Sequence, residues 1–226
     1  MVYKNFLKNM IAKYGLNTFI LMAAISALLI LAGIFVNNGW IKYGLIIIGF
    51  LFLIFNLNFF RDPERTPPDR NDVIVSPADG EVLFVKEVYE KRFIDDEAIQ
   101  VSVFMSPLNV HVNRIPIDGK VEYLNYVKGD YLMAFYDKSD LRNERSEIGI
   151  RSRYGKVLFT QVAGFIARRI VYELKEGDTV KMGDRFGMIK FGSRSDIIVP
   201  KKWTPAVKPG DKVKAGESIL FEYKND

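Results

Sequence analysis

The first quarter of this 226-residue chain is almost free of charge, and this feature constrains the fold most strongly. Residues Thr18 to Val36 carry no charged side chain, and as a helix they span about 28 Å, close to the hydrocarbon thickness of a bilayer. Three turn-forming residues, Asn37 to Gly39, follow, and a second apolar run extends from Trp40 to Phe60. The pattern predicts a membrane anchor over residues 1–60, made of an amphipathic segment at residues 3–14 and a hairpin of two apolar helices.

The charges at the two ends of this anchor predict its orientation. Lysines precede the first apolar run and arginines follow the second: Lys4, Lys8, Lys13, Arg61, Arg65 and Arg70. The turn between the runs is uncharged, so by the positive-inside rule both ends face the cytoplasm. We therefore expect a protein of the cell membrane whose remaining domain faces the cytoplasm and whose linker arginines attract anionic lipid. The first run is too long for a signal peptide, and a hairpin that enters only one leaflet is the alternative.

Residues 61–226 have the pattern of a mainly β soluble domain. Strands are expected at Val73–Val75, Glu81–Val88, Ala98–Met105, Gly119–Val127, Val157–Val162, Val171–Glu173, Arg185–Phe191 and Glu217–Tyr223. Asp-Gly within Ser76–Gly80 predicts a tight hairpin turn between the first two strands. The segment Glu176–Asp184 recurs as Pro209–Glu217, and the shared pattern Gly-Asp-x-Val-Lys-x-Gly resembles the hammerhead turn of lipoyl and biotinyl domains. We therefore expect a barrel-like domain.

The composition excludes several classes of chemistry. The chain has no cysteine, which rules out disulfides and thiolate chemistry, and its one histidine, His111, cannot form a multi-histidine metal site. No metal is expected. The net charge of +5 suits either nucleic acid or an anionic membrane. The apolar anchor favours the membrane, so we expect no nucleic-acid partner.

Three segments carry residues suited to catalysis, and each has an ordinary structural explanation. Asp79 suits a turn, His111 suits an apolar strand, and the pair Gly192-Ser193 suits a loop. Together they permit a Ser–His–Asp relay, as in a lipid hydrolase, although the Gly-x-Ser-x-Gly turn of many hydrolases is missing.

The Gly-Ser pair permits a different reaction. The Ser193 hydroxyl can attack the unshielded carbonyl of Gly192, and ester formation with β-elimination then leaves a pyruvoyl group. Two alternatives remain, a lipoyl-like adaptor module and a carrier domain with its group on Lys190.

Six motifs occur in an order that resembles the short form of the phosphatidylserine decarboxylase family. They are Phe59–Arg65, Ser76–Gly80, Met105–Arg114, Asn143–Arg145, Ala167–Val171 and Gly183–Ser193. The resemblance implies self-cleavage between Gly192 and Ser193 into a β chain, residues 1–192, and an α chain, residues 193–226. It also implies a pyruvoyl cofactor made from Ser193, which captures the serine amine of a membrane lipid and acts as an electron sink while CO₂ leaves.

The same resemblance assigns roles to further residues. Asp79 and His111 match positions for maturation and proton transfer. Many members carry a second histidine where this chain has Arg114, which is a poor base and is expected to bind substrate carboxylate or phosphate, together with Asn113. The sequence leaves open whether the lipid is phosphatidylserine or its ether-linked archaeal counterpart, and it is compatible with a homo-oligomer.

Overall fold

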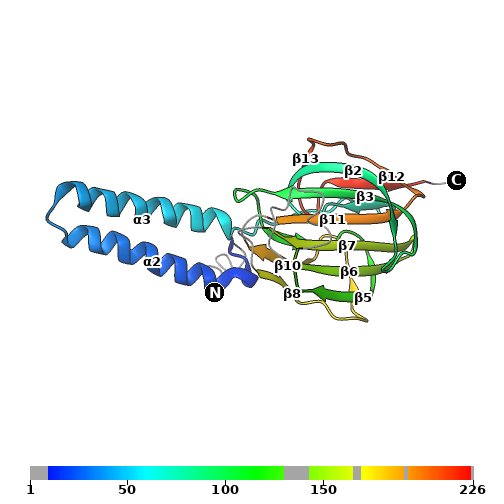
Figure 1. Ribbon diagram of the computed structural model, residues 1–226, viewed down its shortest axis with the longest axis horizontal. Helices are drawn as coiled ribbons and strands as arrows, with labels where there is room; N and C mark the ends of the chain where they lie inside the picture. The colour runs from blue at the N-terminus through cyan, green and yellow to red at the C-terminus, as the bar shows by residue number, and fades with distance from the viewer. Residues whose placement is uncertain (1–9, 130–142, 165–168, 191–192, 225–226) are drawn as a thin grey trace. The chain divides into compact units, whose positions relative to one another are not determined.

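The computed structural model describes residues 10–129, 143–164, 169–190 and 193–224. The chain divides into two compact units, Met1–Pro63 and Glu64–Asp226. The first unit contains the helices and the second contains the strands (Figure 1). Gly192 and part of the motif at 167–171 lie outside the described residues, as does most of the predicted amphipathic segment.

The helical unit is an antiparallel pair, α2 (Leu16–Phe35) and α3 (Gly39–Phe59), preceded by the 3₁₀ turn η1 (Lys13–Gly15). The side chain of Asn38 caps α3 by accepting from the amides of Trp40 and Ile41. Small residues allow close packing, since a Cβ at Gly49 would lie 2.7 Å from Ile30. Both helices are long and apolar enough to cross a membrane, and their bounds agree with the predicted runs to within two residues.

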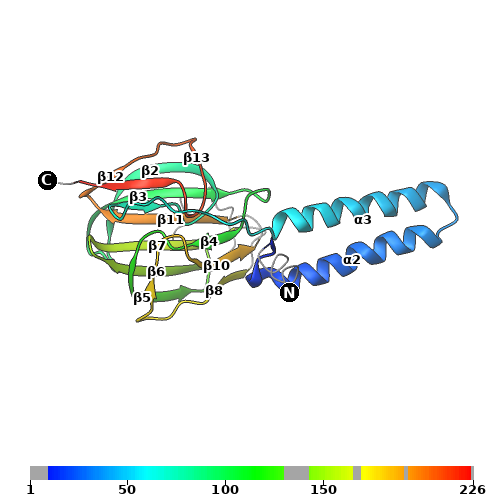
Figure 2. The ribbon, with the colours of Figure 1, turned by 180° about the vertical axis from the view of Figure 1, so that it is seen from behind.

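The second unit is built from antiparallel strands in three sheets within the described residues (Figures 1 and 2). The large curled sheet has the order β13-β2-β3-β11-β7-β6-β5-β9, and the two small sheets are β1-β14-β12 and β4-β10-β8. The strands are β1 (Val73–Val75), β2 (Gly80–Glu90), β3 (Asp96–Met105), β4 (Val112–Arg114), β5 (Gly119–Val127), β6 (Arg145–Ser152), β7 (Gly155–Ala163), β8 (Arg169–Tyr172), β9 (Thr179–Val180), β10 (Arg185–Lys190), β11 (Ser193–Pro200), β12 (Trp203–Pro205), β13 (Lys212–Val213) and β14 (Ile219–Tyr223).

The strand order is symmetric about the middle of the large sheet. Strands β13, β2, β3 and β11 on one side correspond to β9, β5, β6 and β7 on the other, and the two small sheets correspond to each other. Two backbone hydrogen bonds cross between the halves reciprocally, from the Val75 amide to the Pro116 carbonyl and from the Arg114 amide to the Pro77 carbonyl, at 3.0 and 2.9 Å. The domain is therefore a pseudo-twofold duplication, which the repeat in the sequence reveals only in part.

The repeated segments adopt matching turns in the two halves. Gly210 donates to the Val82 carbonyl in one half, and Gly177 donates to the Val121 carbonyl in the other, each at 2.8 Å. Both glycines have positive φ angles, +90° and +93°, which L side chains rarely adopt. The two copies of the repeated segment therefore form equivalent turns, which join β13 to β2 and β9 to β5.

One face of the large sheet packs against the small sheets to form the main core, in which Phe159, Ile197 and Trp203 are fully buried. A smaller cluster covers part of the other face, where the turn after β2 places Ile94 against Leu158 and Ile198. At about 25 cal/mol per Å² of apolar surface, burial on both faces stabilises β7 and β11 as the central strands.

Two expectations about the strands are wrong. Val73–Val75 and the following strand do not form a hairpin, because β1 pairs with β14 and β2 pairs with β3, so Ser76–Asp79 connects two sheets. The Gly-Ser pair was given a loop as its ordinary explanation, yet Ser193 begins β11, a central strand. The predicted strands β2, β3, β5, β7 and β10 are confirmed with small changes in their bounds.

Candidate active site

Ser193 lies at one end of the large sheet, between two neighbouring strands. It pairs with Met105 at the end of β3 and with Ala163 at the end of β7. The side chain is fully buried, and its hydroxyl donates to the Met105 sulfur at 3.2 Å. A hydroxyl in this position can react within its own chain, which needs no entry of a second molecule.

His111 lies next to the segment that leads to Ser193. It precedes β4, whose Val112 pairs with Met188 in β10, and its carbonyl accepts from the Ile189 amide at 3.4 Å. The imidazole is buried, and Nδ1 lies 2.9 Å from the Asn109 carbonyl oxygen. Because a carbonyl can only accept, Nδ1 carries the proton and Nε2 is the basic nitrogen of the neutral ring.

Asn113 joins the Ser76–Asp79 connection to the Ser193 strand end. Its amide nitrogen donates to the Pro77 carbonyl at 3.2 Å and contacts the Met105 sulfur at 3.9 Å, the same sulfur that accepts from Ser193. Its amide oxygen accepts from Gln161 at 2.9 Å. This buried polar network brings the three predicted catalytic segments to one end of the sheet.

Arg114, the departure from the family pattern, is also buried and has a structural partner. Its guanidinium donates to the Gly183 carbonyl at 2.9 Å, and a Cβ on Gly216 would lie 2.8 Å from its side chain. Arg114 thus packs between the two repeated turns. Its contact with substrate, and that of Asn113, stay predictions.

Asp79 lies immediately before β2, at the same end of the sheet as Met105 and Ser193. One carboxylate oxygen accepts from the Ala215 amide at 2.8 Å, and the other forms an ion pair with Arg65 at 2.8 Å. The Arg65 side chain is only 10% exposed. It therefore does not present its charge to a lipid surface, contrary to the expectation for the linker arginines.

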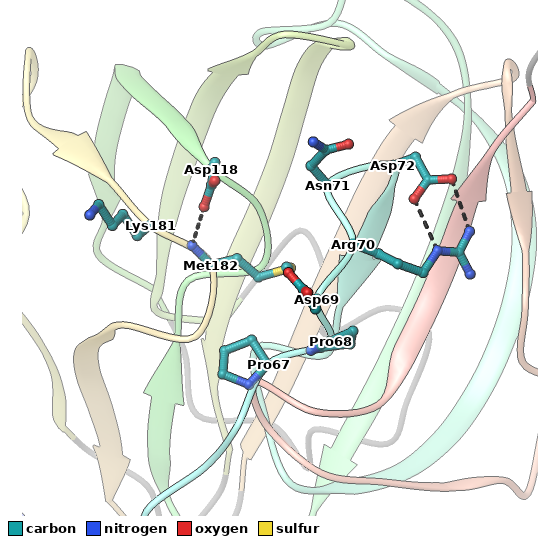
Figure 3. A pocket seen from close by; sticks show the side chains of 9 residues that line it. All are labelled: Pro67, Pro68, Asp69, Arg70, Asn71, Asp72, Asp118, Lys181 and Met182. Carbon is teal, nitrogen blue, oxygen red and sulfur yellow. Dashed lines mark hydrogen bonds and ion pairs between the residues drawn. The ribbon is translucent and has the colours of Figure 1, made fainter.

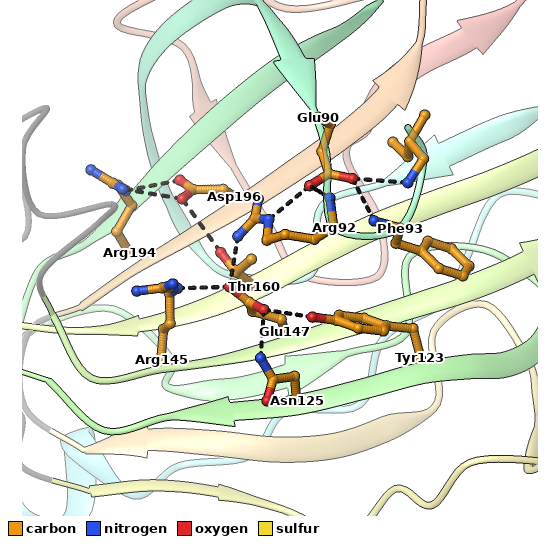
Figure 4. A network of polar contacts seen from close by, with 11 residues as sticks. Glu90, Arg92, Phe93, Tyr123, Asn125, Arg145, Glu147, Thr160, Arg194 and Asp196 are labelled. Atoms are coloured by element: carbon orange, nitrogen blue, oxygen red, sulfur yellow. Dashed lines mark hydrogen bonds and ion pairs between the residues drawn. The ribbon is translucent and has the colours of Figure 1, made fainter. Parts of the chain in front are cut away.

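The opposite face of the sheet carries a buried ionic network that the sequence analysis missed (Figure 4). Arg194, the residue after Ser193, forms an ion pair with Asp196 at 2.8 Å, and its side chain is fully buried. Nearby, Glu147 accepts from Arg92 and Arg145, each at 2.8 Å, and also from two neutral donors. Burial alone would raise the pKa of Glu147, but the hydrogen bonds from Arg145, Arg92 and Asn125 outweigh it and hold that pKa at about 2.

An open hollow of about 550 Å³ lies elsewhere on the domain, at the first copy of the repeated turn, Glu176–Asp184 (Figure 3). It is lined by the linker from Pro67 to Asp72 together with Asp118, Lys181 and Met182. Asp118 accepts from the Met182 amide there, and Arg70 is held by Asp72 and Glu222. None of the three predicted catalytic residues lines this hollow, so we do not assign the chemistry to it.

Comparison with known proteins identifies the family. The family model of phosphatidylserine decarboxylase matches residues 52–221. A phosphatidylserine decarboxylase proenzyme of Chlorobium limicola is 47% identical over 95% of this chain and 100% of its own length. The corresponding proenzyme of Pelodictyon phaeoclathratiforme is 45% identical over the same shares, and that of Salinibacter ruber is 50% identical over 74% of this chain and 75% of its own length.

These matches define the chain as an enzyme of the decarboxylase class. More specifically, it belongs to the phosphatidylserine decarboxylase family. The resemblance seen in the ordered motifs is therefore confirmed.

Proposed function

We propose that this chain cuts itself before Ser193 and then decarboxylates phosphatidylserine to phosphatidylethanolamine at the membrane. The observation that carries this proposal is the buried Ser193 at the end of a central strand, with His111 and Asp79 delivered to the same end of the sheet. The names of the relatives support the substrate and the production of the protein as a proenzyme.

The cut is an intramolecular reaction that needs no entry of substrate. The Ser193 oxygen attacks the Gly192 carbonyl carbon, the peptide C–N bond breaks, and an ester joins the two residues. A base then removes the Ser193 Cα proton and the Cβ–O bond breaks, which releases the Gly192 carboxylate and leaves dehydroalanine. Addition of water to its imine tautomer releases ammonia and leaves the pyruvoyl group. His111, with Nε2 as its basic nitrogen, is the proposed base, and Asp79 is proposed to assist.

The surroundings of Ser193 fit a residue that becomes a new N-terminus. The strand β11 is hydrogen-bonded on both sides, to β3 and to β7, and the Arg194–Asp196 ion pair holds its other face. The proposed α chain also contributes the buried Trp203 and Phe221 to the main core. The α chain therefore stays in place after the cut, with its first residue at the sheet end.

In the mature enzyme the pyruvoyl group supplies an electron sink for the departing CO₂. After CO₂ has left, the carbon that carried it must be protonated, and we propose that His111 donates this proton. The buried position of His111 excludes bulk water from this step. A lipid substrate suits the apolar helices, which we propose span the cell membrane with the catalytic domain on the cytoplasmic side.

The proposal is tested with the full-length protein in detergent micelles. On a denaturing gel and by intact mass, the wild type should separate into residues 1–192 and 193–226, whereas Ser193→Ala should stay whole and inactive. Ser195→Ala is the matched control, because it removes a buried hydroxyl from the same strand and should leave the cut intact. Borohydride with substrate should inactivate the wild type. An uncut wild-type chain that decarboxylates phosphatidylserine would refute the proposal.

A further inference from the structure

The Asp79 carboxylate has a structural twin in the other half of the domain. The sequences Pro77-Ala-Asp79-Gly80 and Pro116-Ile-Asp118-Gly119 occupy equivalent places before β2 and β5. Asp79 accepts from the Ala215 amide at 2.8 Å, and Asp118 accepts from the Met182 amide at 2.6 Å. Both aspartates therefore have the same structural role: each accepts a hydrogen bond from a backbone amide of a repeated turn.

The two aspartates differ in the ion pair that Arg65 forms with Asp79. Arg65 approaches Asp79 at 2.8 Å with one guanidinium nitrogen and Glu217 at 3.0 Å with another. Among the described residues, Asp118 has no such ion pair, and its surroundings are the open hollow of Figure 3. Of the two aspartates, Arg65 pairs only with the one at the Ser193 end of the sheet, so the arginine is not needed to form the turn.

The ion pair of Arg65 with Asp79 fixes the orientation of the Asp79 carboxylate. A guanidinium presents its donors in a rigid planar fork, so binding two carboxylates at once leaves Arg65 little freedom to rotate. The Arg65 and Asp79 side chains are 10% and 11% exposed, which limits competition from water.

We propose that Arg65 is a positioning residue for self-cleavage, which holds the Asp79 carboxylate in the orientation that the reaction at Ser193 requires. The inference rests on the proposed function, in which Asp79 assists the cut. Arg65 lies two residues beyond Pro63, where the helical unit ends, so the segment that leaves the anchor also completes the catalytic site. Another ion pair of this linker, Glu64 with Arg185, involves a glutamate that is 68% exposed and serves as a comparison.

The experiment follows self-cleavage in real time. Full-length chains are synthesised without cells into nanodiscs, synthesis is stopped, and the uncut fraction is measured over time on denaturing gels. We expect Arg65→Gln to slow the cut about 10–100-fold, as loss of a residue that orients a functional group commonly does. Arg65→Lys retains the charge and should recover part of the rate. Glu64→Gln, which removes the exposed linker ion pair, and Asp118→Asn, which alters the twin turn, should each cut within about twofold of wild type.

The melting temperature separates positioning from folding. Uncut Arg65→Gln is compared with uncut Ser193→Ala, and similar melting temperatures are expected. The inference is overturned if Arg65→Gln cuts at the wild-type rate, or if Arg65→Lys and Asp118→Asn are as slow as Arg65→Gln, because the effect would then come from the turn. If the wild type does not cut, or if Ser193→Ala does, the proposed function fails and this inference falls with it.

Discussion

Removing the charge of Glu147 should destabilise the catalytic unit by an amount that disappears in acid. Glu147 is 1% exposed and accepts four hydrogen bonds, two of them from arginines. Its pKa is held at about 2 against an ordinary value of 4.5, a difference worth about 3 kcal/mol when the site is fully shielded. The Arg92 side chain is 34% exposed and is partly screened by water, so we expect Glu147→Gln to cost about 2 kcal/mol at pH 7.

The dependence on pH follows from the direction of the shift. A folded-state pKa below the unfolded-state value means that the contribution is complete above the ordinary value of 4.5 and is lost as the pH falls toward about 2. Protonated glutamate resembles glutamine in shape and charge. The difference in free energy of unfolding between wild type and Glu147→Gln should therefore fall from about 2 kcal/mol at pH 5 toward zero at pH 2.

The assay is thermal unfolding of the full-length protein in detergent, followed by the fluorescence of the buried Trp203 in a Trp40→Phe background. At pH 7 the melting temperatures should differ by about 4–8 °C. Glu122→Gln is the control, because Glu122 forms an exposed ion pair with Arg151 and should change the melting temperature by about 1 °C or less at any pH. A difference for Glu147→Gln that is as large at pH 3 as at pH 7 would refute the electrostatic explanation.

Three further changes test other parts of the fold. Gly216→Ala should lower the free energy of unfolding by about 2–3 kcal/mol, because Gly216 has a φ of +75° and its added Cβ would clash with Arg114. Gly210→Ala should cost only about 1 kcal/mol, because Gly210 has a φ of +90° but open space around it. Asn113→Leu should lower the free energy of unfolding by about 2 kcal/mol, because it leaves the buried side-chain amide of Gln161 without its acceptor. It should also slow self-cleavage measurably, because it removes the hydrogen bond that holds the Ser76–Asp79 connection at Pro77. Gly49→Ile should separate the two helices and lower the cross-linking yield of cysteine pairs placed across them, in a chain that has no cysteine of its own.

The sequence predicted those elements whose residues show one simple pattern. The helices α2 and α3 follow from long apolar runs in which Lys42 is the one charged residue, and β5 follows from a segment rich in valine and tyrosine. Strands β6 and β11 were missed because their sequences, Arg145–Ser152 and Ser193–Pro200, mix charged residues with apolar ones. Arg145 pairs with Glu147 and Arg194 with Asp196, in each case two residues along the same strand, so oppositely charged side chains share one buried face (Figure 4). Arg92, from the turn after β2, adds a distant partner for Glu147, and the pattern of β6 alone does not contain that contact.

The sequence suggests the residues of the candidate site, whose roles stay predictions, but it does not contain their arrangement. The ordered motifs identified Ser193, His111 and Asp79, because the family resemblance needs only their order in the sequence. Arg65 was instead given a role at the lipid surface, since its two partner carboxylates are 14 and 152 residues away in the chain. A contact between residues so far apart depends on the duplicated fold, which brings both repeated turns to the linker.

The duplication offers a physical reason why the proposed chemistry would occur at one end of the large sheet. By the register of the strands, the pair Met105 and Ser193 corresponds to the pair Ser152 and Gly155 at the opposite end. There a tight turn joins β6 directly to β7, and Gly155 has a φ of +111°, so the end is closed by a short connection. At the Ser193 end the paired strands β3 and β11 are far apart in sequence, so no short turn joins them. The segment with His111 and the Arg65–Asp79 pair lie at this end instead. The symmetric scaffold provides two equivalent ends, and the proposed catalytic residues lie at the end where the symmetry is broken.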